Sequence, residues 1–240
     1  MNVALILSGG RGTRMGSDIP KQYILVNDRP IISYCLETIF RHPMIDAVQI
    51  VAEEEFHGLI KDEIVKMLSI ETKDMFKGFS TPGENRQMSI LNGLRDIRKY
   101  ASDADTVLIH DAARPFVTGE LIDNCYEAII GHEGVLPVLP MKDTVYISGN
   151  GQRITSLLDR GRVFAGQAPE LFLIGKYYNA NQDLLPDKIM SINGSTEPAV
   201  MAGMDVVMIP GDEANVKITT KADLDECEGK FESIRIKRYQ

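Results

Sequence analysis

The chain has 240 residues, of which 44% are hydrophobic and 25% charged, a composition typical of a globular protein with one well-packed core. Its formal net charge of −8 argues against a broad electrostatic surface for nucleic acid, although a local basic pocket is compatible with it. The sequence has neither the ~20 consecutive apolar residues of a membrane helix nor the pattern of a secretory signal. We therefore expect a cytoplasmic protein with a small-molecule partner, no nucleic acid and no membrane.

The cysteines and histidines are scattered along the chain. Cys35, Cys125 and Cys227 are widely separated and lack a CxxC spacing, which predicts reduced and mostly buried thiols. The four histidines form no set with zinc-ligand spacing, so we expect no zinc.

The first segment combines an apolar run with a glycine-rich loop. Residues 3–7 predict a buried strand, and the glycines that follow predict a turn with little side-chain bulk. Glycines let backbone N–H groups approach an anion, and Arg11, Arg14 and Lys21 add three cations nearby. The loop is not a Walker A motif, which ends in GK[ST]. It predicts a cradle for a nucleoside triphosphate; a plain turn with solvated basic residues is the alternative.

Helical and strand patterns then alternate along the chain. The apolar spacing predicts helices over 30–40, 54–68, 85–100 and 120–130, and strands over 47–52, 75–79, 106–109 and 134–139. This alternation predicts an α/β protein of Rossmann-like architecture, with a mostly parallel sheet and helices on both faces. Ligands of such sheets bind beyond the carboxyl ends of the strands.

The strand at 106–109 leads into the motif His110-Asp111-Ala112-Ala113-Arg114-Pro115. Magnesium takes few protein carboxylates and completes its coordination with substrate phosphates. We therefore expect Asp111 to bind Mg²⁺, with Arg114 beside it. The alternative role of an aspartate at this position is to cap a turn or helix.

A third motif, Gly83-Glu84-Asn85-Arg86-Gln87-Met88-Ser89, opens the helix at 85–100. The N–H groups of the helix start, together with Gly83, Glu84 and Ser89, could read the edge of a nucleobase. Glu84 has the alternative role of a first-turn acid that complements the helix dipole. For Arg86 the sequence suggests an internal ion pair with either Asp111 or Glu84.

The segment 142–163 interrupts the alternation. Two strand-like pieces, 143–148 and 153–157, flank a Gly-Asn-Gly turn and predict a β-hairpin. Because an isolated hairpin is marginally stable in water, we expect an arm that packs on a second copy of the chain. An antiparallel edge folded on its own sheet is the alternative. Apart from this arm, residues 1–240 are expected to form one domain.

The C-terminal part contains Lys217 in a strand-like run, 215–219, followed by a helix predicted over 221–239. The apolar neighbours of Lys217 are compatible with an inward-pointing amine, and a surface lysine is the alternative.

Together these motifs resemble the cytidylyltransferases that make CDP-polyols. The residues that carry the resemblance are LSGGRGTRMG with PKQY, GENRQMS, HDAARPF, Pro140 to Thr144, Leu157 to Arg160 and NVKIT. They occur in the family's order and span essentially the whole chain. The family has two main branches, the 2-C-methyl-D-erythritol 4-phosphate enzyme of isoprenoid synthesis and the ribitol 5-phosphate enzyme of wall-polymer synthesis.

The resemblance implies a nucleotidyltransferase fold and a role for each motif. It implies catalytic roles for Arg14, Lys21 and Lys217, with Mg²⁺ as the cofactor on Asp111. The residues implied to hold CTP are Ser8, Gly9, Gly10, Gly12, Gly83, Glu84, Ser89 and Ala112. Those implied to hold the polyol phosphate are Arg114, Thr144, Arg160 and Ser195, together with Lys217. Family members are homodimers in which the arm brings the equivalents of Thr144 and Arg160 into the neighbouring subunit's site.

The reaction implied is transfer of CMP from CTP to 2-C-methyl-D-erythritol 4-phosphate or D-ribitol 5-phosphate, with release of pyrophosphate. A phosphate monoester with a second pKa of about 6 is already largely ionised at neutral pH, so the reaction needs no general base. The alternatives are a nucleotidyltransferase for another sugar or small phosphorylated acceptor, and an inactive nucleotide-binding homologue.

The sequence departs from the family pattern at three places. Ala168-Pro169-Glu170 stands where Thr-Pro-Gln is usual. Ala214 replaces an acid of the methylerythritol branch, and Ser195-Thr196-Glu197-Pro198 replaces its Thr-Asp-Glu-Ala. The loop start LSGG and the ending GDE-x-N-x-KITT look closer to the ribitol branch.

Overall fold

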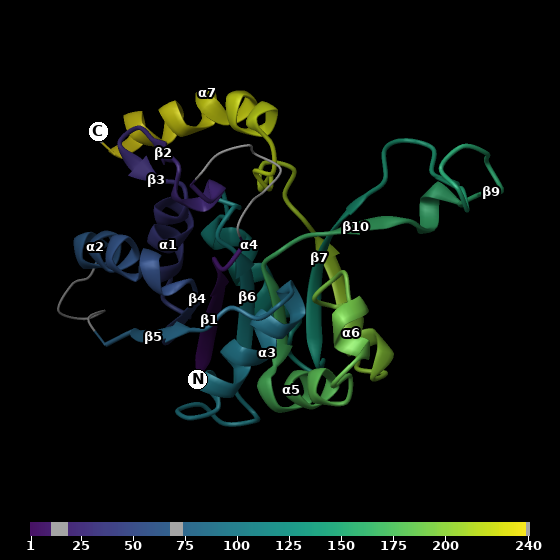
Figure 1. The fold of residues 1–240 in the computed structure, drawn as a ribbon, viewed down its shortest axis with the longest axis horizontal. Helices are drawn as coiled ribbons and strands as arrows, with labels where there is room; N and C mark the ends of the chain where they lie inside the picture. Colours follow the sequence, from purple (N-terminus) through teal and green to yellow (C-terminus); the bar gives the residue numbers. More distant parts are fainter. Residues whose placement is uncertain (11–18, 68–73, 239–240) are drawn as a thin grey trace.

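A mixed, mostly parallel sheet forms the centre of the computed structural model, which describes residues 1–10, 19–67 and 74–238 (Figure 1). Its strands are β1 (Asn2–Leu7), β4 (Ala47–Val51), β5 (Phe76–Ser80), β6 (Thr106–Asp111), β7 (Gly134–Pro140), β10 (Phe164–Gly166), β11 (Glu170–Leu173) and β12 (Val206–Pro210). The order is β10-β7-β11-β6-β1-β4-β5, with β12 also paired to β7. Within the described residues, four strand pairs are parallel: β1 with β4, β1 with β6, β4 with β5, and β12 with β7. The antiparallel strands are β10 and β11.

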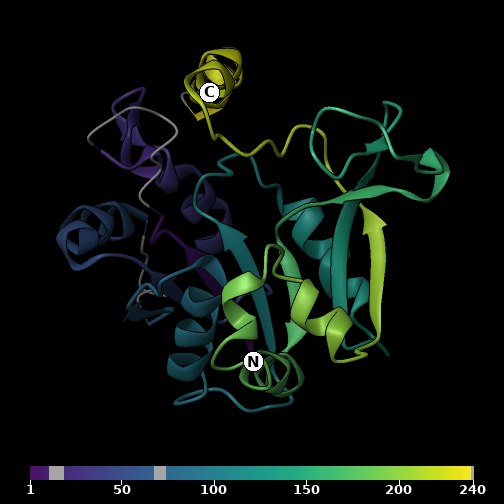
Figure 2. The ribbon, with the colours of Figure 1, turned by 45° about the vertical axis from the view of Figure 1, so that its right-hand side comes forward.

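Helices cover both faces of the sheet, as the alternation predicts (Figure 2). One face packs on α1 (Ile32–Phe40), α2 (His57–Met67) and α4 (Gly119–Ala128), and the other on α3 (Arg86–Ile97), α5 (Ile174–Gln182) and α6 (Glu197–Met201). Strand β1 shows the division, because Ala4 and Ile6 belong to the first cluster while Val3 and Leu5 belong to the second. Successive side chains of a strand point to opposite faces, so a continuous apolar run is what a sheet covered on both sides requires.

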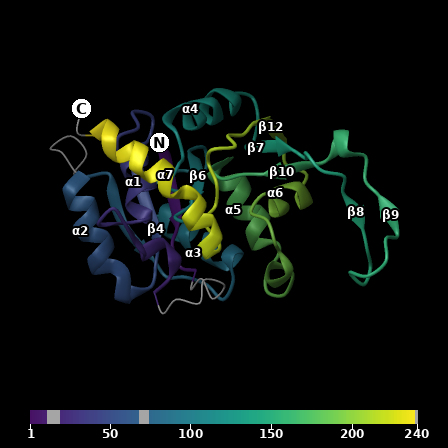
Figure 3. The ribbon, with the colours of Figure 1, turned by 90° about the horizontal axis from the view of Figure 1, so that it is seen from above.

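The last helix, α7 (Lys221–Arg238), lies over α1 and the end of β6 in both the front and top views (Figures 1 and 3). Its Phe231 is fully buried in a small cluster with Ile31, Tyr34 and Phe116. Cys35, Cys125 and Cys227 are free and buried, as predicted. None of the helices within the described residues combines the length and apolar composition that a membrane crossing requires.

The segment after β7 projects from the body of the molecule as an arm (Figures 1 and 3). Strands β8 (Tyr146–Ile147) and β9 (Ser156–Leu157) pair antiparallel, which is a shorter hairpin than the sequence predicts. Asn150 Oδ1 accepts hydrogen bonds from the backbone N–H groups of Gln152 and Arg153, and these bonds close the turn at the tip.

Several short elements complete the chain: η2 (Lys21–Tyr23), β2 (Leu25–Val26), β3 (Arg29–Pro30), η3 (Glu54–Phe56), η4 (Arg160–Arg162) and η5 (Lys188–Ser191). One prediction is wrong. The run 215–219 is irregular rather than a strand, because its Ile218 N–H donates to the Ala113 carbonyl in the loop after β6 instead of joining a sheet ladder.

Candidate active site

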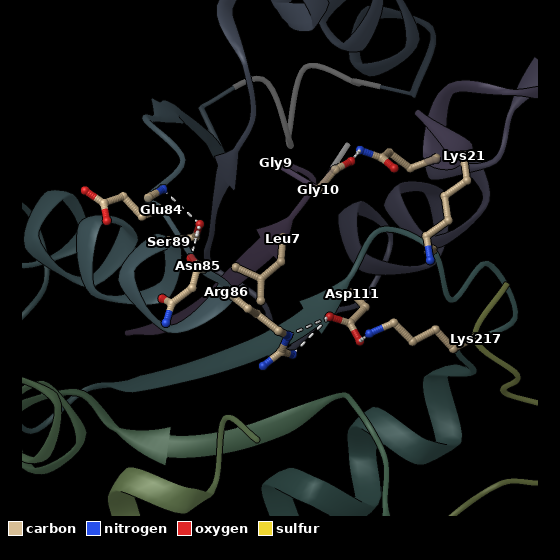
Figure 4. Close-up of a pocket in the computed structure, with 13 residues that line it drawn as sticks. Leu7, Gly9, Gly10, Lys21, Glu84, Asn85, Arg86, Ser89, Asp111 and Lys217 are labelled. Atoms are coloured by element: carbon tan, nitrogen blue, oxygen red, sulfur yellow. Dashed lines mark hydrogen bonds and ion pairs between the residues drawn. The ribbon is translucent and has the colours of Figure 1, made fainter. Parts of the chain in front are cut away.

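A cavity of about 360 Å³ lies beyond the carboxyl ends of β1 and β6 (Figure 4). Its lining comes from the glycine loop, the η2 turn, the start of α3, the end of β6 and the 215–219 segment. The lining residues are Leu7, Gly9, Gly10, Lys21, Gln22, Gly83, Glu84, Asn85, Arg86, Ser89, Asp111, Ala113 and Lys217. Motifs that are far apart in the sequence therefore meet at one cavity, where this fold class places its ligands.

The start of the glycine loop is held by the η2 turn. Gln22 Nε2 donates to the carbonyls of Ser8 and Gly10 at 2.7 and 2.9 Å, and the Tyr23 hydroxyl lies 2.8 Å from Ser8 Oγ. The Ser8 N–H continues the sheet by donating to Val51 at 2.8 Å. The Pro-Lys-Gln-Tyr motif thus fixes the loop through Gln22 and Tyr23 and places Lys21 on the cavity wall.

Two glycines let the loop and the start of α3 approach each other. A Cβ at Gly9 would lie 2.7 Å from Pro82 Cβ, and one at Gly83 would lie 2.8 Å from the Ser89 nitrogen. Real Cβ atoms do not approach so closely, so a larger residue at Gly9 would push the loop away from Pro82, and one at Gly83 would distort the first turn of α3. These glycines are therefore required by packing as well as by ligand approach.

The start of α3 is capped on the cavity side. Asn85 Oδ1 accepts from the Met88 N–H at 2.7 Å, and Ser89 Oγ accepts from the Gly83 N–H at 2.9 Å. Glu84 is exposed at this end of the cavity and forms no ion pair with Arg86. A helix N-terminus with oriented N–H groups favours polar or anionic ligand atoms.

Asp111 is the electrostatic centre of the cavity. Arg86 Nη2 lies 2.9 Å from Asp111 Oδ1, and Lys217 Nζ lies 2.8 Å from Oδ2. Arg114 Nε is 3.7 Å from Oδ2, and Arg114 Nη1 donates to the Asn215 carbonyl at 2.7 Å. Three cations thus surround one carboxylate, which leaves an excess of positive charge for a phosphate ligand.

Burial and charge act in opposite directions on Asp111. Burial alone would raise the pKa of this carboxyl, but the charges of Arg86, Lys217 and Arg114 outweigh burial and hold the pKa well below its usual range. Asp111 is therefore ionised throughout the neutral range. Its neighbour His110 is different, because burial lowers the pKa of the imidazole to about 4 and keeps it neutral.

Figure 4 shows that the cavity has two ends. Lys21 and Lys217 lie on one side, while Glu84 and Ser89 lie on the opposite side, with Asp111 and Arg86 between them. An elongated ligand with an anionic end and a hydrogen-bonding end matches this arrangement. A nucleoside triphosphate has both features.

Eight of the residues singled out in the sequence line this cavity: Gly9, Gly10, Lys21, Gly83, Glu84, Ser89, Asp111 and Lys217. Ser8 lines a neighbouring cavity of about 280 Å³, and Ala112 is buried behind the wall. Ser195 is also buried, with its hydroxyl donating to Glu170 Oε1 at 2.5 Å. Arg14 and Gly12 lie outside the described residues.

Thr144 and Arg160 lie on the arm, where both side chains are exposed. Arg160 Nη1 donates to the Lys142 carbonyl at 2.8 Å, so it is held within the arm. A single chain does not bring these two residues to the cavity.

The sequence did not single out Gln22 and Asn85, and it left the partner of Arg86 open. The structure pairs Arg86 with Asp111. Local sequence features could have identified both residues. Gln22 directly follows Lys21, and Asn85 directly precedes the first residue of α3, which is the N-cap position. Asparagine is among the favoured residues for such a cap.

Comparisons with known proteins agree with this geometry. The family model described as 2-C-methyl-D-erythritol 4-phosphate cytidylyltransferase matches residues 2–232. A protein of that name from Clostridium beijerinckii is 32% identical over 221 residues, covering 92% of this chain and 94% of that protein. A ribitol-5-phosphate cytidylyltransferase from Lactiplantibacillus plantarum is 31% identical over 227 residues, covering 93% and 95%.

Solved structures share the fold. The crystal structure of 4-diphosphocytidyl-2C-methyl-D-erythritol synthase from Anaerococcus prevotii has a TM-score of 0.80 at 24% identity and covers 96% of both chains. The 2-C-methyl-D-erythritol 4-phosphate cytidylyltransferase of Francisella tularensis has a TM-score of 0.76 at 23% identity, covering 94% of this chain and 97% of that one.

Proposed function

The chain belongs to the 2-C-methyl-D-erythritol 4-phosphate cytidylyltransferase family of CMP-transferring enzymes, and from this premise we propose how its cavity transfers CMP from CTP to a polyol phosphate. The acceptors that we propose are 2-C-methyl-D-erythritol 4-phosphate and D-ribitol 5-phosphate, since relatives of both names match the chain at 32% and 31% identity. The observation that carries the proposal is the cluster of Asp111 with Arg86 and Lys217 at the floor of a cavity whose far end is the capped start of α3.

In this proposal, CTP spans the cavity from one end to the other. Its base is read at Gly83, Glu84 and Ser89, and its triphosphate is held by the Gly9 and Gly10 backbone together with Lys21. Arg14 is proposed to act with Lys21 on the triphosphate, and Ser8, Gly12 and Ala112 to support the nucleotide. The acceptor phosphate is held beside Asp111 by Lys217 and Arg114, and the buried Ser195, whose hydroxyl donates to Glu170, supports this acceptor end indirectly.

The chemical step is in-line attack of an acceptor phosphate oxygen on the α-phosphorus of CTP. The new bond joins that oxygen to the α-phosphorus, the bond from the α-phosphorus to the bridging β-oxygen breaks, and pyrophosphate leaves with its electron pair. The acceptor oxygen is already ionised, so none of the described residues has to remove a proton. The chain contributes position and positive charge, which are the main sources of catalysis in phosphoryl transfer.

Asp111 is the proposed Mg²⁺ ligand. Within the described part of the chain there is no cluster of three or more acidic, histidine or cysteine side chains that could bind a metal. A single ionised carboxylate facing a phosphate site still fits Mg²⁺, which usually takes one or two carboxylates and fills its coordination with water and phosphate oxygens. The ion, when bound, neutralises phosphate charge. Lys217 and Arg86, the ion-pair partners of Asp111, would supply further positive charge at the phosphates.

The arm is proposed to complete the site in a homodimer. Its apolar side chains are exposed in a single chain, and they include Tyr146, Ile147, Ile154 and Leu157. A hairpin of this size needs packing against another surface to be stable. Each subunit would thereby supply Thr144 and Arg160 to the acceptor end of its neighbour's cavity.

Pyrophosphate release across a panel of nucleoside triphosphates tests the proposal. With each polyol phosphate in turn and Mg²⁺ present, we expect release with CTP and at least about tenfold less with ATP, GTP or UTP, because Gly83, Glu84 and Ser89 are proposed to read the edge of cytosine. Equal release with two or more bases would contradict the proposed CTP site.

A further inference from the structure

A second buried carboxylate lies behind Asp111 and has no part in the mechanism above. Glu170 begins β11, which is hydrogen-bonded to β6, and its register partner is Ile109, two residues before Asp111. Only 7% of Glu170 is exposed. Burying a carboxylate is costly unless charges and hydrogen bonds compensate, so the partners of this one indicate what it does.

Both carboxylate oxygens of Glu170 accept hydrogen bonds from one segment. The Ser195 hydroxyl donates to Oε1 at 2.5 Å, and the Thr196 hydroxyl donates to Oε2 at 3.1 Å. The Ser195 carbonyl in turn accepts from the Tyr177 hydroxyl at 2.6 Å. The chain leading into α6 is therefore fixed to β11 and α5 through two consecutive residues.

Both hydroxyls of this segment donate to Glu170, a pattern that a carboxylate can accept in full. A glutamine side chain offers one acceptor oxygen and one NH₂ donor group, so it accepts from only one of the two hydroxyls. The negative charge of Glu170 also acts on Arg86 and Arg114, the two guanidinium groups that flank Asp111. Two buried carboxylates, Glu170 and Asp111, thus attract the same two arginines.

We propose that Glu170 is a positioning residue for the acceptor phosphate: it fixes the Ser195–Thr196 segment and holds Arg86 and Arg114 beside Asp111 in the arrangement that the acceptor meets. The proposal rests on the proposed function, since it concerns the acceptor end of the same cavity. Glu170 contacts Ser195 and acts on Arg114, both assigned above to the acceptor end, and neither of its two side-chain hydrogen bonds goes to the proposed base contacts Gly83, Glu84 and Ser89. Glu170 therefore acts on acceptor binding and not on CTP binding.

Steady-state kinetics of Glu170→Gln, with each substrate varied in turn, tests this role. We expect kcat/KM for the acceptor to fall about tenfold or more, mainly through a higher KM. The reason is that the charge-assisted hydrogen bonds of Glu170 are lost, and the Ser195–Thr196 segment is then no longer held in place before the acceptor binds. KM for CTP should stay within about twofold of the wild-type value. Glu127→Gln, at an exposed position on α4, is the matched control and should leave all parameters unchanged.

A double-mutant cycle with Ser195→Ala separates positioning from general damage to the fold. Ser195→Ala should lower kcat/KM for the acceptor as well, and the double variant should be no worse than Glu170→Gln alone, since both changes break the same contact. Thermal unfolding of each variant checks folding. If Glu170→Gln does not fold, Ser195→Ala and Thr196→Val test the same contact from its other side.

The role of Glu170 would be overturned by unchanged acceptor kinetics in Glu170→Gln, or by an equal loss for CTP and for the acceptor. Strictly additive losses in the cycle would overturn it too. Failure of the proposed function is distinguishable, because in that case the wild-type protein itself forms no CDP product.

Discussion

Lys21 and Asp111 illustrate how single residues define the site. Lys21 reaches the cavity because Gln22 and Tyr23, its two successors, hold the glycine loop and the η2 turn together. Asp111 ends β6 and is kept ionised by the cations around it. Neither residue needs to exchange a proton during the proposed reaction, so charge and position are their whole contribution.

Replacing Lys21 with alanine should reduce kcat by about 10²- to 10³-fold, because a preorganised charge on the triphosphate is lost in the transition state. The fold should be retained, because the hydrogen bonds of Gln22 and Tyr23 hold the start of the loop. Turnover with saturating CTP and acceptor measures the effect, and circular dichroism checks the fold. Lys77→Ala, at an exposed position on β5, is the control. Near-native turnover of Lys21→Ala would exclude the assigned role.

The parts of the site that lie at the carboxyl ends of strands could be predicted from the sequence. The glycine loop, the 83–89 motif and the 110–115 motif each follow a strand directly, so the apolar pattern locates them at the carboxyl edge of the sheet. Position along a strand is local information, and the structure brings all three motifs together at one cavity.

The rest of the site depends on contacts that no local pattern contains. Glu170 lies near Asp111 because β11 pairs antiparallel with β6, and the buried Ser195 bonds to Glu170 on β11 and to Tyr177 on α5. The run at 215–219 alternates like a strand, yet its backbone bonds to the loop at Ala113. Predicting these contacts requires knowledge of the order of the strands in the sheet, and the sequence pattern does not specify that order.

The junction between Lys217 and α7 is held by one side chain. Asp223 accepts hydrogen bonds from the Thr219 hydroxyl, the Thr219 N–H and the Thr220 N–H at 2.6, 2.7 and 2.8 Å. These bonds, led by the one from the Thr219 hydroxyl, lower the pKa of Asp223 from 3.8 to about 2. The start of α7 is thereby tied to the segment that carries Lys217.

Asp223→Asn should lower the free energy of unfolding by about 1 kcal/mol at pH 7, the usual effect of a lost cap at an exposed site. A carboxyl whose folded pKa is depressed stabilises the fold above its unfolded pKa, and this contribution disappears as the pH falls through the folded value. The difference between wild type and variant should therefore shrink as the pH falls from about 5 towards the folded pKa of about 2. Urea unfolding at several pH values measures it, and a pH-independent difference would contradict the assignment.

In the molecule as a whole, the arm is a feature whose apolar side chains remain uncovered within a single chain. It extends away from the sheet, and Ile154 and Leu157 are 67% and 62% exposed. Thr144 and Arg160 lie on the arm rather than at the cavity of their own chain. A second copy of the chain is the partner that we propose to cover this apolar surface.

The double variant Ile154→Asp/Leu157→Asp should dissociate the dimer, because charges replace apolar contacts in the interface. Sedimentation equilibrium should give a dimer for the wild type and a monomer for the variant. The monomer should also lose acceptor kcat/KM, since it lacks the neighbour's Thr144 and Arg160. Val65→Asp, at an exposed apolar position on α2, is the control and should remain dimeric. A wild-type protein that is monomeric and fully active would refute the role of the arm.

A cavity that joins CTP to a polyol phosphate must release a CDP-polyol, which mass spectrometry of the reaction product detects. The protein is incubated with CTP, Mg²⁺ and either 2-C-methyl-D-erythritol 4-phosphate or D-ribitol 5-phosphate. We predict the mass of a CDP-polyol with at least one acceptor, formed together with an equimolar amount of pyrophosphate. Binding of CTP without any CDP product from either acceptor would exclude this transferase activity.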